Sequence, residues 1–143
     1  MFVLDTNVVS ELRKARLGKA DAKVAKWADG VDAVSLYVSA ITILELEIGV
    51  LQMEDRDPSQ GAILRAWMDN RVMQEFTDRI LPIDTAVAQR CARLHVPDRR
   101  AERDALIAAT ALVHGMTVVT RNVADFEQTG VPLLNPWCGS RDR

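Results

Sequence analysis

The stretch FVLDTN, residues 2–7, leads directly from three apolar residues into an acid, a hydroxyl and an amide. An apolar run this short, followed by polar residues, is typical of a buried strand in a parallel sheet. In open α/β sheets, ligands bind in the crevice beyond the carboxyl ends of the strands. Asp5 leaves the end of this strand, so it is expected to face such a crevice.

Similar apolar runs recur along the chain and alternate with segments of helical spacing. The strands are expected at 2–4, 34–39, 80–83, 117–120 and 132–134, and the helices at 7–14, 20–29, 42–53, 60–76, 84–96 and 103–114. Gly115 is expected to end the last helix. The polar stretch EDRDPSQG, residues 54–61, is expected to form a loop between two helices. This alternation predicts a three-layer α/β/α fold around a central, mostly parallel sheet of about four or five strands.

Size and composition point to an ordinary globular protein. The chain has 143 residues, and residues 1–143 are expected to form a single domain. Its formal net charge of −2 argues against broad electrostatic adhesion to nucleic acid or membranes. Its two cysteines have neither metal-ligand spacing nor a disulfide framework, which favours a reduced, cytoplasmic setting. The longest apolar stretch, ALIAATALV, is too short to span a bilayer, so no membrane association is expected.

Three further acids occupy the same kind of position as Asp5. Glu45 lies in the first turns of the helix after the second strand, Asp104 opens the last apolar helix, and Asp125 follows the fourth strand. Each acid alone is explained equally well by its favourable interaction with a helix dipole. Their joint occurrence at one edge of the expected sheet is what favours a functional cluster.

Helix capping is the structural alternative for the same residues. Asp5 or Asn7 could cap the first helix. Thr42 followed by Glu45 matches a capping box, and Asn122 followed by Asp125 matches it less well.

Clustered carboxylates imply protonation or a cation. Two like charges about 4 Å apart repel by roughly 4 kcal/mol at an effective dielectric constant near 20. The neighbouring side chains are oxygen donors, namely those of Thr6, Asn7, Thr120 and Asn122, and no His or Cys pair accompanies them. Oxygen-only ligands suit Mg²⁺ or Mn²⁺, which can activate water and bind phosphates. The pattern therefore predicts a metal-dependent nuclease, in which His95 and His114 are structural.

Four segments of the chain resemble the PIN-domain ribonucleases, in particular the VapC-type toxins of bacterial toxin–antitoxin modules and their FitB-like branch. These segments are FVLDTNVVSEL (2–12), SAITILELEIGV (39–50), RDALIAATALVHGMTVVTRNVADF (103–126) and LLNPW (133–137). The resemblance covers nearly the whole chain. It implies a Mg²⁺- or Mn²⁺-dependent endoribonuclease toxin, hydrolysing RNA with metal-activated water, whose catalytic and metal-binding acids are Asp5, Glu45, Asp104 and Asp125. Glu47, two residues after Glu45, is expected to point elsewhere.

The resemblance also implies supporting residues and partners. Thr6, Asn7, Thr120 and Asn122 would support the metal ligands or bind water. Arginines close in sequence to these segments could contact RNA phosphates, although a solvated helix face explains most of them better; they are Arg13, Arg99, Arg100, Arg103 and Arg121. Arg121 is the best placed of them, because it lies between Thr120 and Asn122. The expected partners are an RNA substrate, a cognate VapB-like antitoxin and a second copy of the chain. The apolar content of the helices at 42–53 and 60–76 exceeds the need of one sheet face and is typical of a protein-binding surface.

Two other functional classes remain open. A non-catalytic PIN-fold binding module would bind no divalent metal. An aspartyl-phosphate phosphotransfer enzyme would need a second acid where Asn7 stands, or a late lysine, and no lysine follows Lys26. A dinucleotide-binding enzyme is excluded because no glycine follows the first strand.

Overall fold

The computed structural model describes residues 1–138 and contains one five-stranded parallel sheet. The strands are β1 (Phe2–Leu4), β2 (Leu36–Ser39), β3 (Ile80–Leu81), β4 (Thr117–Val119) and β5 (Leu133–Leu134), in the order β3-β2-β1-β4-β5. Each lies within a predicted strand, and several are shorter than predicted. The first strand of the chain is the central one, so the residues that follow it lie at the middle of the sheet edge.

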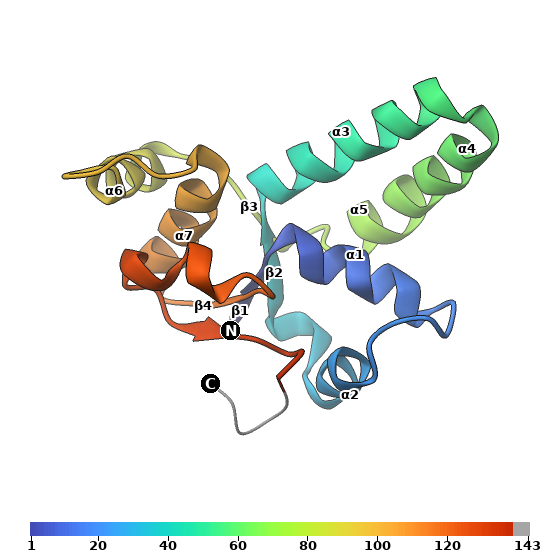
Figure 1. The fold of residues 1–143 in the computed structure, drawn as a ribbon, viewed down its shortest axis with the longest axis horizontal. Helices are drawn as coiled ribbons and strands as arrows, with labels where there is room; N and C mark the ends of the chain where they lie inside the picture. Colours follow the sequence, from blue (N-terminus) through green and yellow to red (C-terminus); the bar gives the residue numbers. More distant parts are fainter. Residues whose placement is uncertain (139–143) are drawn as a thin grey trace.

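Seven α-helices surround this sheet within the described residues (Figure 1). They are α1 (Thr6–Ala15), α2 (Ala22–Gly30), α3 (Ala40–Arg56), α4 (Pro58–Trp67), α5 (Met73–Glu75), α6 (Thr85–Leu94) and α7 (Glu102–His114). In Figure 1, α6 and α7 lie on one side of the sheet, and α1, α3, α4 and α5 lie on the other. The predicted α/β/α architecture is confirmed.

The sheet has a hydrophobic core on each face. Val3 and Val118 belong to the cluster beneath α6 and α7, whereas Leu4 and Val119 belong to the cluster beneath α1 and α3. Successive side chains of a strand point to opposite faces, so a strand covered on both sides must be apolar at every position. This requirement explains why the apolar run of β1 is uninterrupted up to Asp5.

The predicted loop at residues 54–61 is wrong. Helix α3 continues to Arg56 and α4 begins at Pro58, which leaves Asp57 alone between them. The Asp57 side chain accepts a hydrogen bond from the Gln60 amide, and Pro58 occupies a first-turn position where its missing N–H is no loss. The polar, Pro-containing stretch therefore marks a helix start within a tight hairpin.

Gly61 allows the two helices of this hairpin to lie in direct contact. A Cβ atom at this position would stand 2.4 Å from the Cα of Glu54. No side chain fits at that distance, so glycine is required by the close approach of α4 to α3.

Gly115 follows α7 with a φ of 66°, in the left-handed region, so the predicted glycine stop is confirmed. The helix predicted at 60–76 is not continuous, because a π-helical turn at Met68–Val72 separates α4 from α5.

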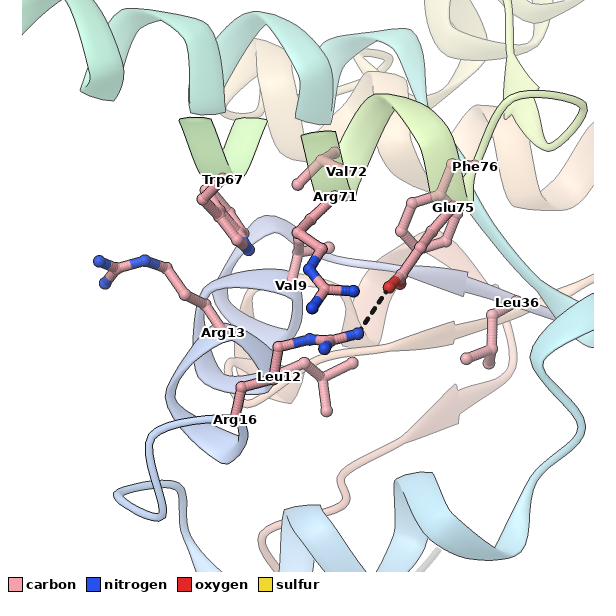
Figure 2. A pocket seen from close by; sticks show the side chains of 10 residues that line it. All are labelled: Val9, Leu12, Arg13, Arg16, Leu36, Trp67, Arg71, Val72, Glu75 and Phe76. Carbon is pink, nitrogen blue, oxygen red and sulfur yellow. Dashed lines mark hydrogen bonds and ion pairs between the residues drawn. The ribbon is translucent and has the colours of Figure 1, made fainter. Parts of the chain in front are cut away.

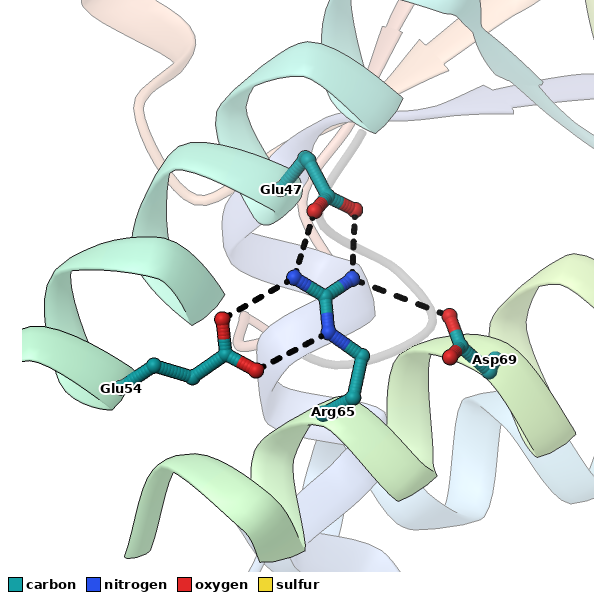
Figure 3. A network of polar contacts seen from close by, with 4 residues as sticks. All are labelled: Glu47, Glu54, Arg65 and Asp69. Carbon is teal, nitrogen blue, oxygen red and sulfur yellow. Dashed lines mark hydrogen bonds and ion pairs between the residues drawn. The ribbon is translucent and has the colours of Figure 1, made fainter. Parts of the chain in front are cut away.

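An ion-pair network ties α3 to α4 (Figure 3). Arg65 Nη2 lies 2.7 Å from Glu47 Oε2, and Arg65 Nε lies 3.2 Å from Glu54 Oε2. The hydrogen bond from Arg65 lowers the pKa of Glu47. Glu47 therefore points away from the acids at the sheet edge, as predicted, and its carboxylate is bound within the hairpin.

No helix within residues 1–138 combines the length and the apolar character needed to cross a membrane.

Candidate functional site

Asp5 is a buried carboxylate held from three sides. Its side chain is 6% exposed at the end of β1. Asp5 Oδ1 accepts a hydrogen bond from the Thr6 amide at 2.8 Å. Asp5 Oδ2 accepts one from Thr120 Oγ1 at 2.8 Å and another from Asn7 Nδ2 at 3.2 Å. Asp5 is the N-cap residue of α1, so the capping interpretation holds for Asp5, whereas Asn7 lies inside the helix and supports Asp5 instead.

The residues after β4 complete this support. Asn122 donates its backbone N–H to Thr120 Oγ1 at 3.0 Å, and Arg121 donates its backbone N–H to Asn7 Oδ1 at 3.3 Å. Four of the predicted polar residues thus form one hydrogen-bonded group with Asp5: Thr6, Asn7, Thr120 and Asn122. The group joins the ends of two adjacent parallel strands.

Glu45 reaches the same region from α3. Its Oε1 atom accepts a hydrogen bond from Thr6 Oγ1 at 2.6 Å, and its Oε2 atom lies 3.6 Å from Arg103 Nη1. The predicted capping box is wrong, because the N-cap of α3 is Ser39, which accepts a hydrogen bond from the Ile41 amide.

Thr42 lies at the site, whereas the sequence pattern placed it in a capping box. It is fully buried, and its hydroxyl lies 3.2 Å from that of Thr6, which itself binds Glu45. The three-residue spacing of Thr42 and Glu45 puts both on one helix face, and this spacing was the available signal.

Asp104 lies in the first turn of α7, where the charges of all three other acids affect its pKa. Burial raises its pKa to about 6, with further contributions from the charges of Asp5, Asp125 and Glu45. Burial also raises the pKa of Asp5, hydrogen bonds from Thr120 and Thr6 oppose the rise, and the charge of Glu45 adds to it. The four acids predicted from four distant segments therefore share one electrostatic environment.

Asp125 is the most exposed of the four. It ends a 3₁₀ turn, Val123–Asp125, whose N-cap Asn122 makes no side-chain capping bond. The weaker of the two predicted capping boxes is therefore also wrong, and the Asp125 carboxylate is left to face solvent and the other acids.

The donor chemistry of the cluster fits a hard divalent cation. Within residues 1–138, no three His, Cys, Asp or Glu side chains stand close enough together to hold a metal ion, and Glu45 is instead held by Thr6 and Arg103. The available donors are carboxylate, hydroxyl and amide oxygens, which Mg²⁺ and Mn²⁺ prefer. Burial, and after it the charges of the other three acids, raise the pKa of Asp104. A bound cation would relieve the repulsion among these charges.

The remaining candidates have structural contacts. His95 Nδ1 accepts a hydrogen bond from the Arg100 amide at 3.1 Å, and His114 is exposed in the last turn of α7. The Arg121 guanidinium lies over the Trp137 ring, 5.3 Å from its centroid. Arg121 is exposed beside the site, as its sequence position predicted.

Comparison with known proteins identifies similar chains along almost the whole length. The family model described as "PIN domain" matches residues 2–131. VapC ribonuclease Y4jK of Sinorhizobium fredii is 36% identical over 142 residues, covering 96% of this chain and 98% of its own. Toxin FitB of Neisseria gonorrhoeae is 33% identical and covers 96% of this chain and 99% of its own. The solved structure of FitAB bound to an IR36 DNA fragment has 32% identity and a TM-score of 0.88, with 100% of both chains covered.

Proposed function

Because the chain belongs to the PIN-domain family, we propose that it is a Mg²⁺- or Mn²⁺-dependent endoribonuclease and the toxin of a type II toxin–antitoxin module. The observation that carries this proposal is the meeting of Asp5, Glu45, Asp104 and Asp125 in one electrostatic environment at the carboxyl edge of the sheet. The names of the relatives, VapC ribonuclease and toxin FitB, support the same activity.

In this proposal the divalent ion draws the four acids together, because within residues 1–138 they do not yet stand close enough to hold a metal ion. The surrounding polar residues hold the acids near the site. Bound Mg²⁺ or Mn²⁺ supplies Lewis-acid chemistry, lowering the pKa of water and offsetting charge on the phosphate. Thr120 and Asn7 fix the carboxylate of Asp5 before any ligand arrives, so Asp5 itself needs little reorganisation. Thr6 holds Glu45 in the same way from the neighbouring helix.

A carboxylate then accepts the proton of the attacking water. The water oxygen bonds to phosphorus and the proton of the water passes to Asp104 or Glu45. The bond from phosphorus to the leaving oxygen breaks, and that oxygen takes up a proton from solvent. Asp104 and Glu45 lie in one electrostatic environment, so either carboxylate can serve as this base.

Metal-dependent cleavage is the first test. Purified protein is expected to cut cellular RNA in Mg²⁺ or Mn²⁺, to lose at least about a hundredfold in rate in excess EDTA, and to recover when Mg²⁺ exceeds the chelator. Gel mapping of the RNA fragments measures this. Equal cleavage with and without EDTA would contradict the proposal, and a lack of both cleavage and Mn²⁺ binding would favour the non-catalytic binding module. A labile acyl phosphate trapped on Asp5 would favour the phosphotransfer alternative.

We also propose that residues 1–143 act as a single cytoplasmic domain. The two hydrophobic clusters share one sheet, and the family match spans residues 2–131. Residues 139–143 lie outside the described part of the chain.

A groove beside α1 is the surface we propose for the cognate antitoxin (Figure 2). Apolar side chains of α1, β2, α4 and the turn after it form its floor, and charged side chains form its rim. These residues are Val9, Leu12, Leu36, Trp67, Val72 and Phe76 on the floor, and Arg13, Arg16, Arg71 and Glu75 on the rim. The apolar floor suits an amphipathic segment of a partner protein.

The charged residues of the rim indicate which charge the partner segment should carry. Arg16 Nη2 pairs with Glu75 Oε1 at 2.9 Å, whereas within residues 1–138 neither Arg13 nor Arg71 has a carboxylate within ion-pair distance. Arg13 lies instead over the Trp67 ring, 5.8 Å from its centroid. Two uncompensated arginines above an apolar floor favour an acidic partner segment.

Charge reversal tests this groove. Arg71→Glu is expected to weaken binding of the cognate antitoxin about a hundredfold, because it places like charges in contact across the interface. Titration of the purified antitoxin into the toxin measures the change. The control is Arg56→Glu, since Arg56 is exposed at the end of α3 and does not line the groove. Wild-type affinity for Arg71→Glu would exclude the groove as the antitoxin site.

A separate apolar surface remains for a second copy of the chain. Leu44 and Leu51 of α3 are 46% and 53% exposed, and Ile63 of α4 is 53% exposed. Much of the apolar excess predicted for these helices lies in the core, for example at Leu46 and Val50, while these three residues are left outside it. We propose that this surface forms the homodimer contact.

A further inference from the structure

Arg103 is the basic side chain that contacts the acidic cluster. Among the described residues, its ion pair with Glu45 is the one that reaches any of the four acids, with Nη1 and Oε2 separated by 3.6 Å. Arg103 is the second residue of α7 and directly precedes Asp104. One guanidinium group is thus adjacent to Asp104 along the chain and to Glu45 in space.

This ion pair is easily exchanged for another. The Arg103 side chain is 51% exposed and that of Glu45 is 26% exposed, and ion pairs that are open to solvent contribute little to stability. The other oxygen of Glu45 is held more closely, by Thr6 Oγ1 at 2.6 Å. Glu45 can therefore keep its place on α3 while Arg103 turns to a different anion.

The neighbouring arginines are engaged differently. Arg100 donates from Nε to the Leu94 carbonyl at 2.7 Å and from Nη2 to the Gln128 carbonyl at 3.2 Å, so it ties two segments of the backbone together. The guanidinium of Arg121 lies over Trp137. In the part of the chain that the structure describes, the guanidinium of Arg103 has its ion pair with Glu45 and no hydrogen bond to the backbone.

We infer that Arg103 is a substrate-positioning residue with two alternating partners: Glu45 while the site holds no cation, and a phosphate oxygen of RNA once a divalent ion has taken the place beside Glu45. The inference rests on the proposed function. A divalent cation repels the guanidinium and competes with it for the same carboxylate oxygen. A guanidinium presents parallel N–H donors that match two phosphate oxygens. Arg103 therefore opposes cation binding and favours RNA binding.

Opposite effects on the two ligands distinguish this role from a structural one. In calorimetric titration with Mn²⁺ and no RNA, Arg103→Gln is expected to bind the ion about threefold more tightly than the wild-type protein. Arg93→Gln is the matched control, because it removes the same charge from an exposed position on α6 that has no ion pair among the described residues. Its Mn²⁺ affinity is expected to match the wild type.

Kinetics with a single-stranded RNA oligonucleotide supply the second readout. Arg103→Gln is expected to raise KM about tenfold and to change kcat little, because a charged hydrogen bond to the substrate is lost. The slope of log(kcat/KM) against log salt concentration should become less steep by about 0.7, which corresponds to one phosphate contact. Arg103→Lys keeps the charge, so its salt slope is expected to equal that of the wild type. Its KM is expected to lie between those of the wild type and Arg103→Gln.

Each result decides the role of Arg103. Unchanged Mn²⁺ affinity, unchanged KM, or a change in only one of them would overturn the alternation of partners. Weaker Mn²⁺ binding together with a lower Tm would also overturn it, because Arg103 would then be supporting the fold. This inference alone is overturned if the wild-type protein binds Mn²⁺ and cuts RNA but Arg103→Gln gives the same results as Arg93→Gln. A wild-type protein that does neither overturns the proposed function as well.

Discussion

Asp5→Asn is expected to reduce RNA cleavage by about a thousandfold or more while the protein stays folded. Asparagine has nearly the same shape and keeps an oxygen that can accept from the Thr6 amide, as Asp5 Oδ1 does at 2.8 Å. The lost group is the buried charge that Thr120 and Asn7 hold in place. Burial raises the pKa of Asp5, which means that the fold carries this charge at some expense of stability. The thermal midpoint of Asp5→Asn is therefore expected to equal or exceed that of the ion-free wild type.

Three measurements check this result together. Single-turnover RNA cleavage gives the rate, Mn²⁺ calorimetry gives the ion affinity, and circular dichroism gives the fold. Asp29→Asn serves as control, since Asp29 is exposed in the last turn of α2, and it should behave as the wild type in all three. Cleavage by Asp5→Asn at the wild-type rate would show that the site assignment is wrong.

Asp104→Asn is expected to abolish cleavage to a similar extent, and in addition to stabilise the ion-free protein at neutral pH. The pKa of Asp104 is raised to about 6, first by burial and then by the charges of Asp5, Asp125 and Glu45. Between the ordinary carboxyl pKa and this value, the folded protein holds a proton that the unfolded chain has released. The contribution of Asp104 to stability is therefore present at low pH and lost as the pH rises through 6.

The variant removes this pH dependence. Its thermal midpoint is expected to exceed that of the wild type by about 3 °C at pH 7.5, and the difference should vanish near pH 4. In saturating Mg²⁺ the wild type should have the higher thermal midpoint, because a ligand that binds only the folded state stabilises the protein that still has its site. Thermal scans at the two pH values, with Mg²⁺ and with EDTA, measure the effect. A stabilisation that is equal at both pH values, or that survives in Mg²⁺, would contradict the assignment.

Local sequence patterns predicted much of the fold, with limits that have clear physical causes. The run FVL must be apolar at each position because both faces of the strand are covered, so it stands out in the sequence. The error at residues 54–61 arose because Asp and Pro are typical of loops and of helix starts alike. The close contact at Gly61 depends on where α3 and α4 lie relative to each other, which no local pattern contains.

The sequence by itself determined the elements and the positions of Asp5, Glu45, Asp104 and Asp125 along them, because periodicity and strand ends are local properties of the chain. Only the tertiary structure decided how those carboxylates are held. The bond from Thr120 to Asp5 joins residues 115 positions apart, and it exists because β4 lies beside β1 in the sheet. The contact of Arg103 with Glu45 likewise requires α7 and α3, from opposite faces of the sheet, to meet at its edge. Such contacts follow from strand order and helix placement, which depend on the packing of the whole chain.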